Sequence, residues 1–272
     1  MQVVEANGTR IPLVGLGTWD LRGRVCARMV EAALQLGYRH IDTAAMYGNE
    51  RAVGEGLRAS GVPRDEVFIA TKVWQSDLSA RDFERSTKAS LTNLRLAAMD
   101  LLLIHWPNPN IPLAETIGAL CKMKREGLAR HIGVSNFTLN LIKQAALLAT
   151  EPLVCHQIEC HPFLDQSRVI AASRKHGMAI VAYSPSARGS AKNNAVLARI
   201  GKAHGKSAVQ VCLRWLVQQD IVVIPRTSKP KRLAENFAIF DFELSAANMK
   251  QIAALANPEG RVVDWSGSPK WD

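Results

Sequence analysis

Four side chains of different chemistry stand at long, similar intervals in the first half of this chain. Asp42, Lys72 and His105 are 30 and 33 residues apart, and Tyr47 follows Asp42 by five residues. An acid, an ammonium, a phenol and an imidazole together can deliver a proton to a carbonyl oxygen as it becomes an alkoxide. The phenol has an ordinary pKa of about 10, and a nearby ammonium would lower it. Asp42 would supply the counter-charge that a buried lysine needs.

Each of these residues also has a purely structural interpretation. His105 ends the apolar run "LLLI" at 101–104, where it could be a hydrogen-bonded core residue, a metal ligand or a group placed for chemistry. Asp42 and Lys72 could form a buried ion pair with Tyr47 as its cap. For any one of these residues alone, the structural interpretation is favoured. For all four together at one end of a barrel, a catalytic role is favoured.

The elements that must position these residues alternate between two kinds. Short apolar runs rich in Ile, Val and Leu are separated by segments of helical period, which predicts a parallel α/β sheet. Eight such units in about 250 residues predict a (β/α)8 TIM barrel in a single domain, 1–272. The runs cover residues 13–18, 39–44, 67–73, 101–106, 130–135, 154–159, 179–184 and 221–225.

A doubly wound sheet is the competing fold. That fold usually carries G-x-G-x-x-G after its first strand when it binds a dinucleotide. Here the first run gives "GLGTWD" at 15–20, which lacks the third glycine. The barrel is therefore the better prediction.

Local signals mark the ends of the expected helices. Ser79 is a candidate N-cap with Asp82 three residues later. One apolar face of the segment 139–148 would hold Leu141, Ile142, Ala145 and Leu148. Glycines follow five periodic segments, where a left-handed residue ends a helix. They are Gly37, Gly61, Gly127, Gly177 and Gly205.

Both ends of the chain lie outside the repeating units. The segment "VEANGTRIP" at 4–12, with Asn7-Gly8 as its turn, predicts a β-hairpin that closes the bottom of the barrel. The segment 259–272, here called the tail, is rich in Gly, Pro and Trp. We expect it to form a loop that lies over another part of the molecule.

Polar residues recur where the predicted strands end. In a TIM barrel the carboxyl ends of the strands form the rim of the active site. Neighbouring strands lie about 4.8 Å apart, so the second, third and fourth strand ends should fall within roughly 10 Å. The residues at these ends are Asp42, Lys72, His105, Ser135 with Asn136, Gln157, Tyr183 and Arg226.

Reduction of a carbonyl also needs a source of hydride, and the later strand ends could hold one. Ser135, Asn136 and Gln157 carry hydroxyl and amide groups that can bind a carboxamide. Tyr183 offers a flat ring for stacking. These residues predict a nicotinamide site beside the first four.

The last strand runs into "IPRTSKPKRLAENF" at 224–237. Arg226, Thr227, Ser228 and Arg232 lie around the start of a helix, where backbone N–H groups and the helix dipole favour phosphate. Two arginines there indicate an additional phosphate monoester, as in NADPH. The alternative, that this stretch is only a solvated loop, stays open.

Composition restricts the partners of the chain. The net charge is +10, which favours anionic ligands, but lysine and arginine are spread along the sequence. The densest basic stretch, 226–232, has no interleaved aromatics, so a small anion is a better prediction than nucleic acid. Five irregularly spaced cysteines argue against a disulfide framework. With no visible signal peptide and no apolar run near the ~20 residues of a membrane helix, we expect a cytoplasmic protein without membrane contact.

The stretch "CHQIECH" at 155–161 is similar to a metal site in composition. Alternate side chains of a strand face opposite ways, so these groups cannot all converge. We therefore expect no metal site here.

Taken together, these stretches resemble the aldo-keto reductases over nearly the whole chain, and within them the bacterial enzymes that reduce keto-sugars and 2-oxoaldehydes. The stretches are "GLGTW", "GYRHIDTAAMYGNE", "IATKVW", "DLLLIHWP", "IGVSNF", "HQIECHP", "AYSP" and "IPRTSKPKRLAEN".

The resemblance implies an NADPH-dependent monomer that reduces small aldehydes and ketones. Tyr47 would be the proton donor, Lys72 and Asp42 would modulate it, and His105 would orient the carbonyl. The substrate would lie among Trp19, Tyr47, Trp74, His105 and Trp106, with Trp265 of the tail closing over it. The implied cofactor contacts are Gly17, Thr18, Asp42, Ser135, Asn136, Gln157, Tyr183, Ser184, Arg226, Thr227, Ser228, Arg232, Glu235 and Asn236.

The chain departs from the family pattern in three places. Arg226 stands where lysine is frequent and Thr227 where serine is frequent, and Ser186-Ala187 replaces a common "LG". An arginine keeps the charge but presents a fork of donors rather than a point. Two other functions remain open at this level, namely a regulatory barrel that binds NADPH without turnover and a barrel metallo-hydrolase.

Overall fold

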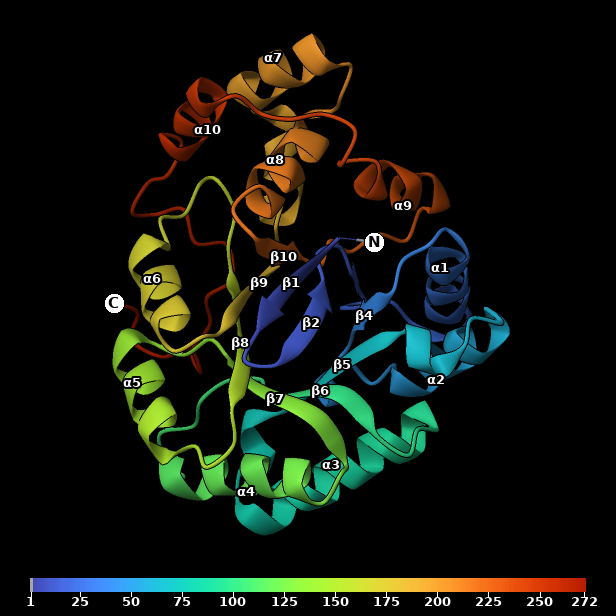
Figure 1. The fold of residues 1–272 in the computed structure, drawn as a ribbon, viewed down its shortest axis with the longest axis vertical. Helices are drawn as coiled ribbons and strands as arrows, with labels where there is room; N and C mark the ends of the chain where they lie inside the picture. The colour runs from blue at the N-terminus through green and yellow to red at the C-terminus, as the bar shows by residue number, and fades with distance from the viewer. Residues whose placement is uncertain (1) are drawn as a thin grey trace.

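Parallel strands form the centre of the molecule, and the computed structural model describes residues 2–272 (Figure 1). The eight strands pair in the order β10-β9-β8-β7-β6-β5-β4-β3. Each predicted apolar run overlaps one of them, so the prediction of eight barrel strands is confirmed. They are β3 (Leu16–Gly17), β4 (His40–Asp42), β5 (Phe68–Val73), β6 (Met99–Ile104), β7 (Ala129–Ser135), β8 (Leu153–Glu159), β9 (Ala179–Tyr183) and β10 (Ile221–Val223).

The sheet closes on itself between its first and last strands. Parallel bridges join Val14 to Val223 and Gly17 to Arg226. A side chain at Gly17 would place its Cβ 2.6 Å from the backbone oxygen of Ile224, so only glycine permits this approach. Closure removes the two edges that an open sheet would leave.

Helices surround the barrel (Figure 1). Every residue of β6 and of β8 is buried, as expected for strands covered by helices on one side and by the barrel interior on the other. The helices are α1 (Gly23–Gln35), α2 (Glu50–Ala59), α3 (Ala80–Leu94), α4 (Leu113–Arg125), α5 (Leu139–Leu148), α6 (Ser167–Lys175), α7 (Ala195–His204), α8 (Ala208–Val217), α9 (Pro230–Phe237) and α10 (Ala246–Ala253).

The predicted helix ends are largely as observed. The five glycines expected to end helices all have positive φ, and Ser79 accepts a hydrogen bond from the backbone N–H of Asp82. One expectation for α5 is wrong, because Leu148 is 39% exposed while Ile142 and Ala145 are buried. Leu148 is the last residue of α5, so no following turn covers its side chain.

A hairpin lies across one end of the barrel, as the sequence predicted (Figure 1). Strand β1 (Val3–Ala6) pairs antiparallel with β2 (Thr9–Pro12). Asn7 and Gly8 form the turn with φ of 41° and 83°, the positive values that a two-residue hairpin turn needs. The side-chain amide of Asn7 donates to the carbonyl of Leu153 at 2.7 Å, which ties the turn to the barrel.

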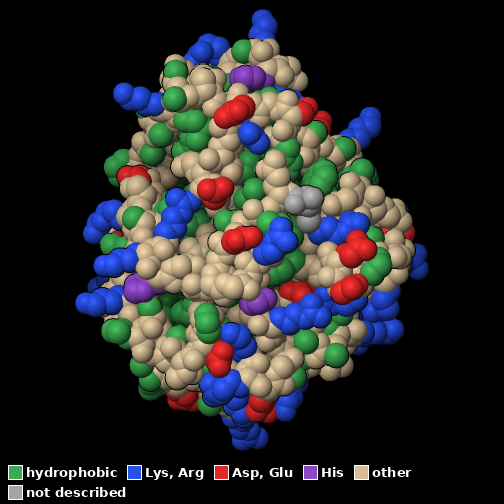
Figure 2. Space-filling view, viewed as in Figure 1, with side chains coloured by type: hydrophobic (Ala, Val, Ile, Leu, Met, Phe, Trp, Pro, Cys, Tyr) green, Lys and Arg blue, Asp and Glu red, His purple; other side chains and the backbone are tan. Residues whose placement is uncertain are grey.

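The face of the molecule that carries this hairpin shows basic and acidic side chains side by side (Figure 2). Lysine and arginine are scattered over this face and do not gather in one patch. Within residues 2–272, no helix is long and apolar enough to cross a membrane.

Candidate active site

An ion pair lies at the carboxyl ends of β4 and β5. Lys72 Nζ donates to Asp42 Oδ1 at 2.5 Å and to the carbonyl of Thr43 at 2.8 Å. Gln157, from β8 across the barrel, donates from Nε2 to the other oxygen of Asp42 at 2.8 Å. The Lys72 side chain is fully buried. Burial lowers the pKa of Lys72, and the charge of Asp42 opposes that shift.

Tyr47 lies against this ion pair at the end of a single 3₁₀ turn, Ala45–Tyr47. Lys72 Nζ is 5.2 Å from the centroid of the Tyr47 ring. The sequence-based expectation of a lowered pKa for this phenol is wrong for the protein alone. Burial raises the pKa of Tyr47 well above its usual value, and the charge of Asp42 raises it further. Since Asp42 already balances the Lys72 ammonium, burial prevails, and Tyr47 is a protonated phenol at neutral pH.

His105 follows β6 and completes the tetrad of Asp42, Tyr47, Lys72 and His105. Its ring meets the Tyr47 ring edge to face, with centroids 5.6 Å apart. Burial lowers the pKa of His105 well below its usual value, and the charge of Lys72 lowers it further. The imidazole is therefore neutral at pH 7. Nδ1 of His105 is buried without a hydrogen-bond partner.

The amide and hydroxyl groups expected to hold a nicotinamide lie next to the tetrad. Asn136 Nδ2 donates to the carbonyl of His105 at 2.9 Å and to Ser135 Oγ at 3.0 Å. Tyr183 donates from its hydroxyl to Asn136 Oδ1 at 2.7 Å. Asn136 has a φ of 61°, a left-handed conformation that asparagine tolerates better than most residues. Because Ser135 Oγ accepts from Asn136, its own proton remains available to a ligand.

Asn49 is a residue of this region that the sequence reasoning missed. It is buried, it accepts from Thr43 Oγ1 at 2.8 Å, and it donates to the carbonyls of Thr18 and Leu21 at 2.8 and 3.0 Å. Thr18 Oγ1 in turn donates to the carbonyl of Asp42 at 3.0 Å. These bonds fix the loop after β3 to the loop that carries Tyr47. Its only sign in the sequence was an asparagine directly before a segment of helical period.

The basic residues after β10 surround the start of α9, as expected. Arg226 donates from Nε to the carbonyl of Trp19 at 3.2 Å, and its Nη2 lies 3.4 Å from Asp20 Oδ2. The backbone N–H of Lys229 donates to Thr227 Oγ1 at 3.0 Å. The remaining residues of the predicted set divide by exposure. Ser228, Arg232 and Glu235 are exposed, while Asn236 is buried.

Indole rings gather beside His105. Trp74 meets the His105 ring at 5.1 Å, and Trp265 stacks on Trp74 with centroids 5.5 Å apart. Trp106 meets Trp265 edge to face at 5.8 Å. The tail therefore closes over the pocket, which confirms that prediction. Trp19 is placed differently, because it is half exposed and its ring contacts the guanidinium of Arg188 at 5.5 Å.

The histidines of the segment 155–161 have hydrogen-bond partners of their own. His156 accepts from the backbone N–H of Phe137 at 3.0 Å and contacts Ser173 Oγ at 2.9 Å. His161 Nε2 is 2.9 Å from Glu159 Oε1. Among residues 2–272, no three side chains of His, Cys, Asp or Glu are grouped so that they could hold a metal ion.

Comparison with known proteins decides the family. The sequence model of the Aldo/keto reductase family matches residues 13–257. The chain belongs to the aldo/keto reductase family. The methylglyoxal reductase DkgB of Escherichia coli O157:H7 is 42% identical over 264 residues, which are 94% of this chain and 99% of that relative. An aldo-keto reductase of Mycolicibacterium smegmatis is 40% identical over 96% of this chain and 97% of its own length.

Solved structures of aldo/keto reductases share the fold closely. A crystal structure described as an inferred 2,5-diketo-D-gluconic acid reductase B has a TM-score of 0.98 and 45% identity, covering 100% of this chain and 98% of that chain. A Bombyx mori aldo-keto reductase in complex with NADP has a TM-score of 0.89 and 32% identity, covering 98% and 95%. The predicted family and the predicted barrel are thus confirmed, and the chain is an enzyme of the class that reduces carbonyl groups.

Proposed function

We propose that this enzyme uses NADPH to reduce small aldehydes and ketones to alcohols. The substrates would be 2-oxoaldehydes such as methylglyoxal and keto-sugars such as 2,5-diketo-D-gluconate. The observation that carries the proposal is the buried Lys72–Asp42 pair, with protonated Tyr47 and neutral His105 beside it. The names of the similar proteins support this choice of substrates.

The donor set fits a nicotinamide cofactor. NADPH, when bound, supplies the hydride that adds to the carbonyl carbon. The Ser135 hydroxyl and the Gln157 side chain would hold the carboxamide, and Tyr183 would stack on the ring. Gln157 donates to Asp42, so the proposed carboxamide site would be connected directly to the tetrad.

Proton delivery in this proposal uses the tetrad alone. As the carbonyl carbon is reduced, its oxygen gains negative charge and takes the proton of the Tyr47 phenol. The Lys72 ammonium, 5.2 Å from the ring centroid, stabilises the phenolate that remains. Asp42 holds that ammonium in place, and neutral His105 donates a hydrogen bond that orients the carbonyl oxygen.

The substitution Tyr47→Phe tests the proposed chemistry. It removes the proton donor and keeps the ring, so turnover of methylglyoxal with NADPH should fall about 10²–10⁴-fold while the Kd for NADPH is unchanged. The measurement is a rate screen with methylglyoxal, 2,5-diketo-D-gluconate and aromatic aldehydes, with cofactor binding followed by fluorescence. Full activity of the variant would refute the role of Tyr47. NADPH binding by the wild type without turnover of any carbonyl would indicate a regulatory barrel instead.

The preference for NADPH rests on Arg226 and Arg232. The Arg226 fork lies next to Trp19 and Asp20, and Arg232 is exposed on the first turn of α9. Replacing Arg232 by Ala removes a charged hydrogen-bond donor, so we expect the Kd for NADPH to rise about 10–100-fold. The Kd for NADH, which lacks the 2′-phosphate, serves as the matched control and should stay constant. An equal rise for both cofactors would contradict this site.

A further inference from the structure

Glu159 ends β8 two residues after Gln157, so the two side chains lie on the same face of the strand. The Glu159 side chain is completely buried. Its carboxylate accepts hydrogen bonds from the backbone N–H groups of Val262 at 2.6 Å and Val263 at 2.9 Å. The same strand thus bonds to the tetrad through Gln157 and to the tail through Glu159.

Two further groups compensate the buried charge of Glu159. The backbone N–H of Phe163 donates to His161 Nδ1 at 3.3 Å, so Nε2 carries the ring proton and donates to Glu159 Oε1 at 2.9 Å. Arg261 Nη1 is 3.9 Å from Glu159 Oε2, and its guanidinium lies 3.7 Å from the centroid of the Trp271 ring. A buried carboxylate is stable only with such partners, so the tail is part of what stabilises Glu159.

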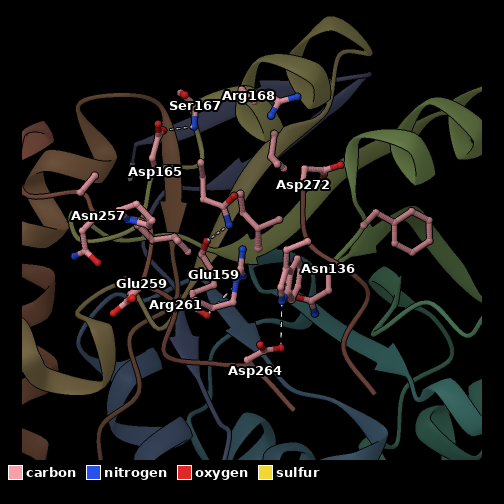
Figure 3. Close-up of a pocket in the computed structure, with 18 residues that line it drawn as sticks. Asn136, Glu159, Asp165, Ser167, Arg168, Asn257, Glu259, Arg261, Asp264 and Asp272 are labelled. Carbon is pink, nitrogen blue, oxygen red and sulfur yellow. Dashed lines mark hydrogen bonds and ion pairs between the residues drawn. The ribbon is translucent and has the colours of Figure 1, made fainter. Parts of the chain in front are cut away.

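Beside these bonds, the start of the tail packs against the protein where buried Gly260 meets the backbone of Phe163. A cavity of about 720 Å³ lies between the tail and the segment that joins β8 to α6 (Figure 3). Its walls include Asp165 and Arg168 from one side and Glu259, Arg261 and Asp264 from the other. Side chains that line a cavity have lost the packing contacts that a filled core would give them. Beside this cavity, residues 262 and 263 are attached to the barrel by their hydrogen bonds to the Glu159 carboxylate.

The anchored tail leads directly to the pocket. Trp265 follows Val263 by two residues and stacks on Trp74 at 5.5 Å, and Trp74 in turn meets His105 at 5.1 Å. Beyond Trp265 the chain is fixed again, because the side chain of Asp272 accepts from the backbone N–H of Leu139 at 2.7 Å. The position of the Trp265 indole therefore depends on where Val262 and Val263 are held.

We propose that Glu159 is a positioning residue for substrate selectivity, acting through the tail on Trp265. The inference rests on the proposed function, since it assigns the Trp74–Trp265 wall to the carbonyl substrate. Glu159 itself would touch neither substrate nor cofactor. Its effect is expected in the KM for the carbonyl compound and in the ratio of rates between small and bulky aldehydes.

The test compares Glu159→Gln with the matched variant Glu259→Gln. Both remove one carboxylate beside the same cavity, but only Glu159 bonds to the tail backbone. Glutamine keeps one acceptor and places an amide donor against the second N–H. We expect Glu159→Gln to raise the KM for methylglyoxal about 10-fold, the usual size of a lost hydrogen bond to a charged group. Its kcat and the Kd for NADPH should change less than about 2-fold, and Glu259→Gln should match the wild type.

Two additional measurements separate positioning from general damage. Amide hydrogen exchange should become faster at Val262 and Val263 in Glu159→Gln and stay slow in the barrel strands. In a Trp265→Ala background, Glu159→Gln should have little further effect on KM, because the residue through which it acts is gone. Additive effects on KM, or unchanged KM and unchanged exchange, would overturn the inference.

Two controls keep the outcome unambiguous. If Glu159→Gln does not fold, Val263→Pro removes one of the two N–H donors from an exterior segment and leaves the carboxylate intact. The same rise in KM is then expected, and an unchanged KM would refute the inference. Should the wild type reduce none of the tested carbonyls, the proposed function fails. Hydrogen exchange in the tail still tests whether Glu159 anchors it.

Discussion

The two ends of the barrel each bury a carboxylate that is paired with cations, and the two clusters differ in one respect. At the hairpin end, Asp100 accepts from Arg64 at 2.6 Å, from Arg130 at 2.9 Å and from the backbone N–H of Ile69 at 2.9 Å. The side chains of Arg64 and Arg130 are 28% and 52% exposed. At the opposite end the cation of Asp42 is Lys72, with 0% exposed.

This difference in exposure separates a structural cluster from a reactive one. Both oxygens are occupied in each carboxylate, but the arginines of the Asp100 cluster keep part of their hydration. The Lys72 side chain has no exposed surface, so solvent does not shield its charge, and that charge lowers the pKa of His105. The ion pairs of Asp100 therefore stabilise the fold, whereas the ion pair of Asp42 and Lys72 sets the electrostatics of the proposed active site.

The largest effect is expected from Lys72→Met at the reactive end. Without the ammonium, the phenolate of Tyr47 loses its stabilisation, and kcat should fall about 10²–10⁴-fold. Removing Lys72 also leaves the buried charge of Asp42 uncompensated, which costs about 3–5 kcal/mol of stability. The measurements are steady-state kinetics and urea unfolding.

A double variant separates these two effects. Asp42→Asn with Lys72→Met removes both charges, so it should recover much of the free energy of unfolding and recover none of the activity. Recovered activity would show that Lys72 serves only as the partner of Asp42.

A smaller and different effect is expected at the hairpin end. Asp100→Asn takes a charge from between two arginines and should lower the free energy of unfolding by about 2 kcal/mol, the usual range for hydrogen bonds to a charged group. Because this cluster is remote from the strand ends that carry the tetrad, kcat and KM should remain those of the wild type. A loss of activity without a loss of stability would contradict the assignment of a purely structural role to the Asp100 cluster.

The smallest expected effect is the change in the free energy of unfolding with pH, and histidines at both ends of the barrel contribute to it. Burial lowers the pKa of His105 well below 6.5, and burial lowers the pKa of His40, beneath the hairpin, below the same value. Burial also lowers the pKa of His156 to about 3. The unfolded chain therefore binds protons below pH 6.5 that the folded protein does not. Stability is present above pH 6.5 and is lost as the pH falls, by up to about 1.4 kcal/mol per pH unit for each histidine.

Urea unfolding between pH 7.5 and 4.5 measures this loss. His105→Gln and His40→Gln should each reduce the slope of stability against pH, although only His105→Gln should impair turnover. A slope that stays at the wild-type value in both variants would contradict the neutral state of these rings.

The strand ends show which features of the fold could be predicted from the sequence. A run such as 101–106 is apolar until His105, and eight such runs at regular spacing determine a barrel with polar residues on one rim. Periodicity and turn chemistry are local properties, so the hairpin turn at Asn7-Gly8 and the glycines that end helices were also predictable. The exposed Leu148 was not, because helical period gives a face but does not say where neighbouring elements stop covering it.

The motif "CHQIECH" shows what local periodicity and turn chemistry cannot predict. From the sequence it was only a false metal site, and nothing showed that Glu159 would accept hydrogen bonds from residues 262 and 263, more than a hundred positions later. Contacts of that kind depend on how distant segments pack against each other.

By itself the sequence determined the barrel, the family and the side chains available at the rim, because strand and helix periods and the residues at strand ends are written locally. Only the tertiary structure decided the charge states of those side chains and the path of the tail. Tyr47 remains a protonated phenol because the fold buries it beside a lysine whose charge Asp42 already balances. Trp265 reaches the pocket because a buried carboxylate on β8 holds the backbone that leads to it.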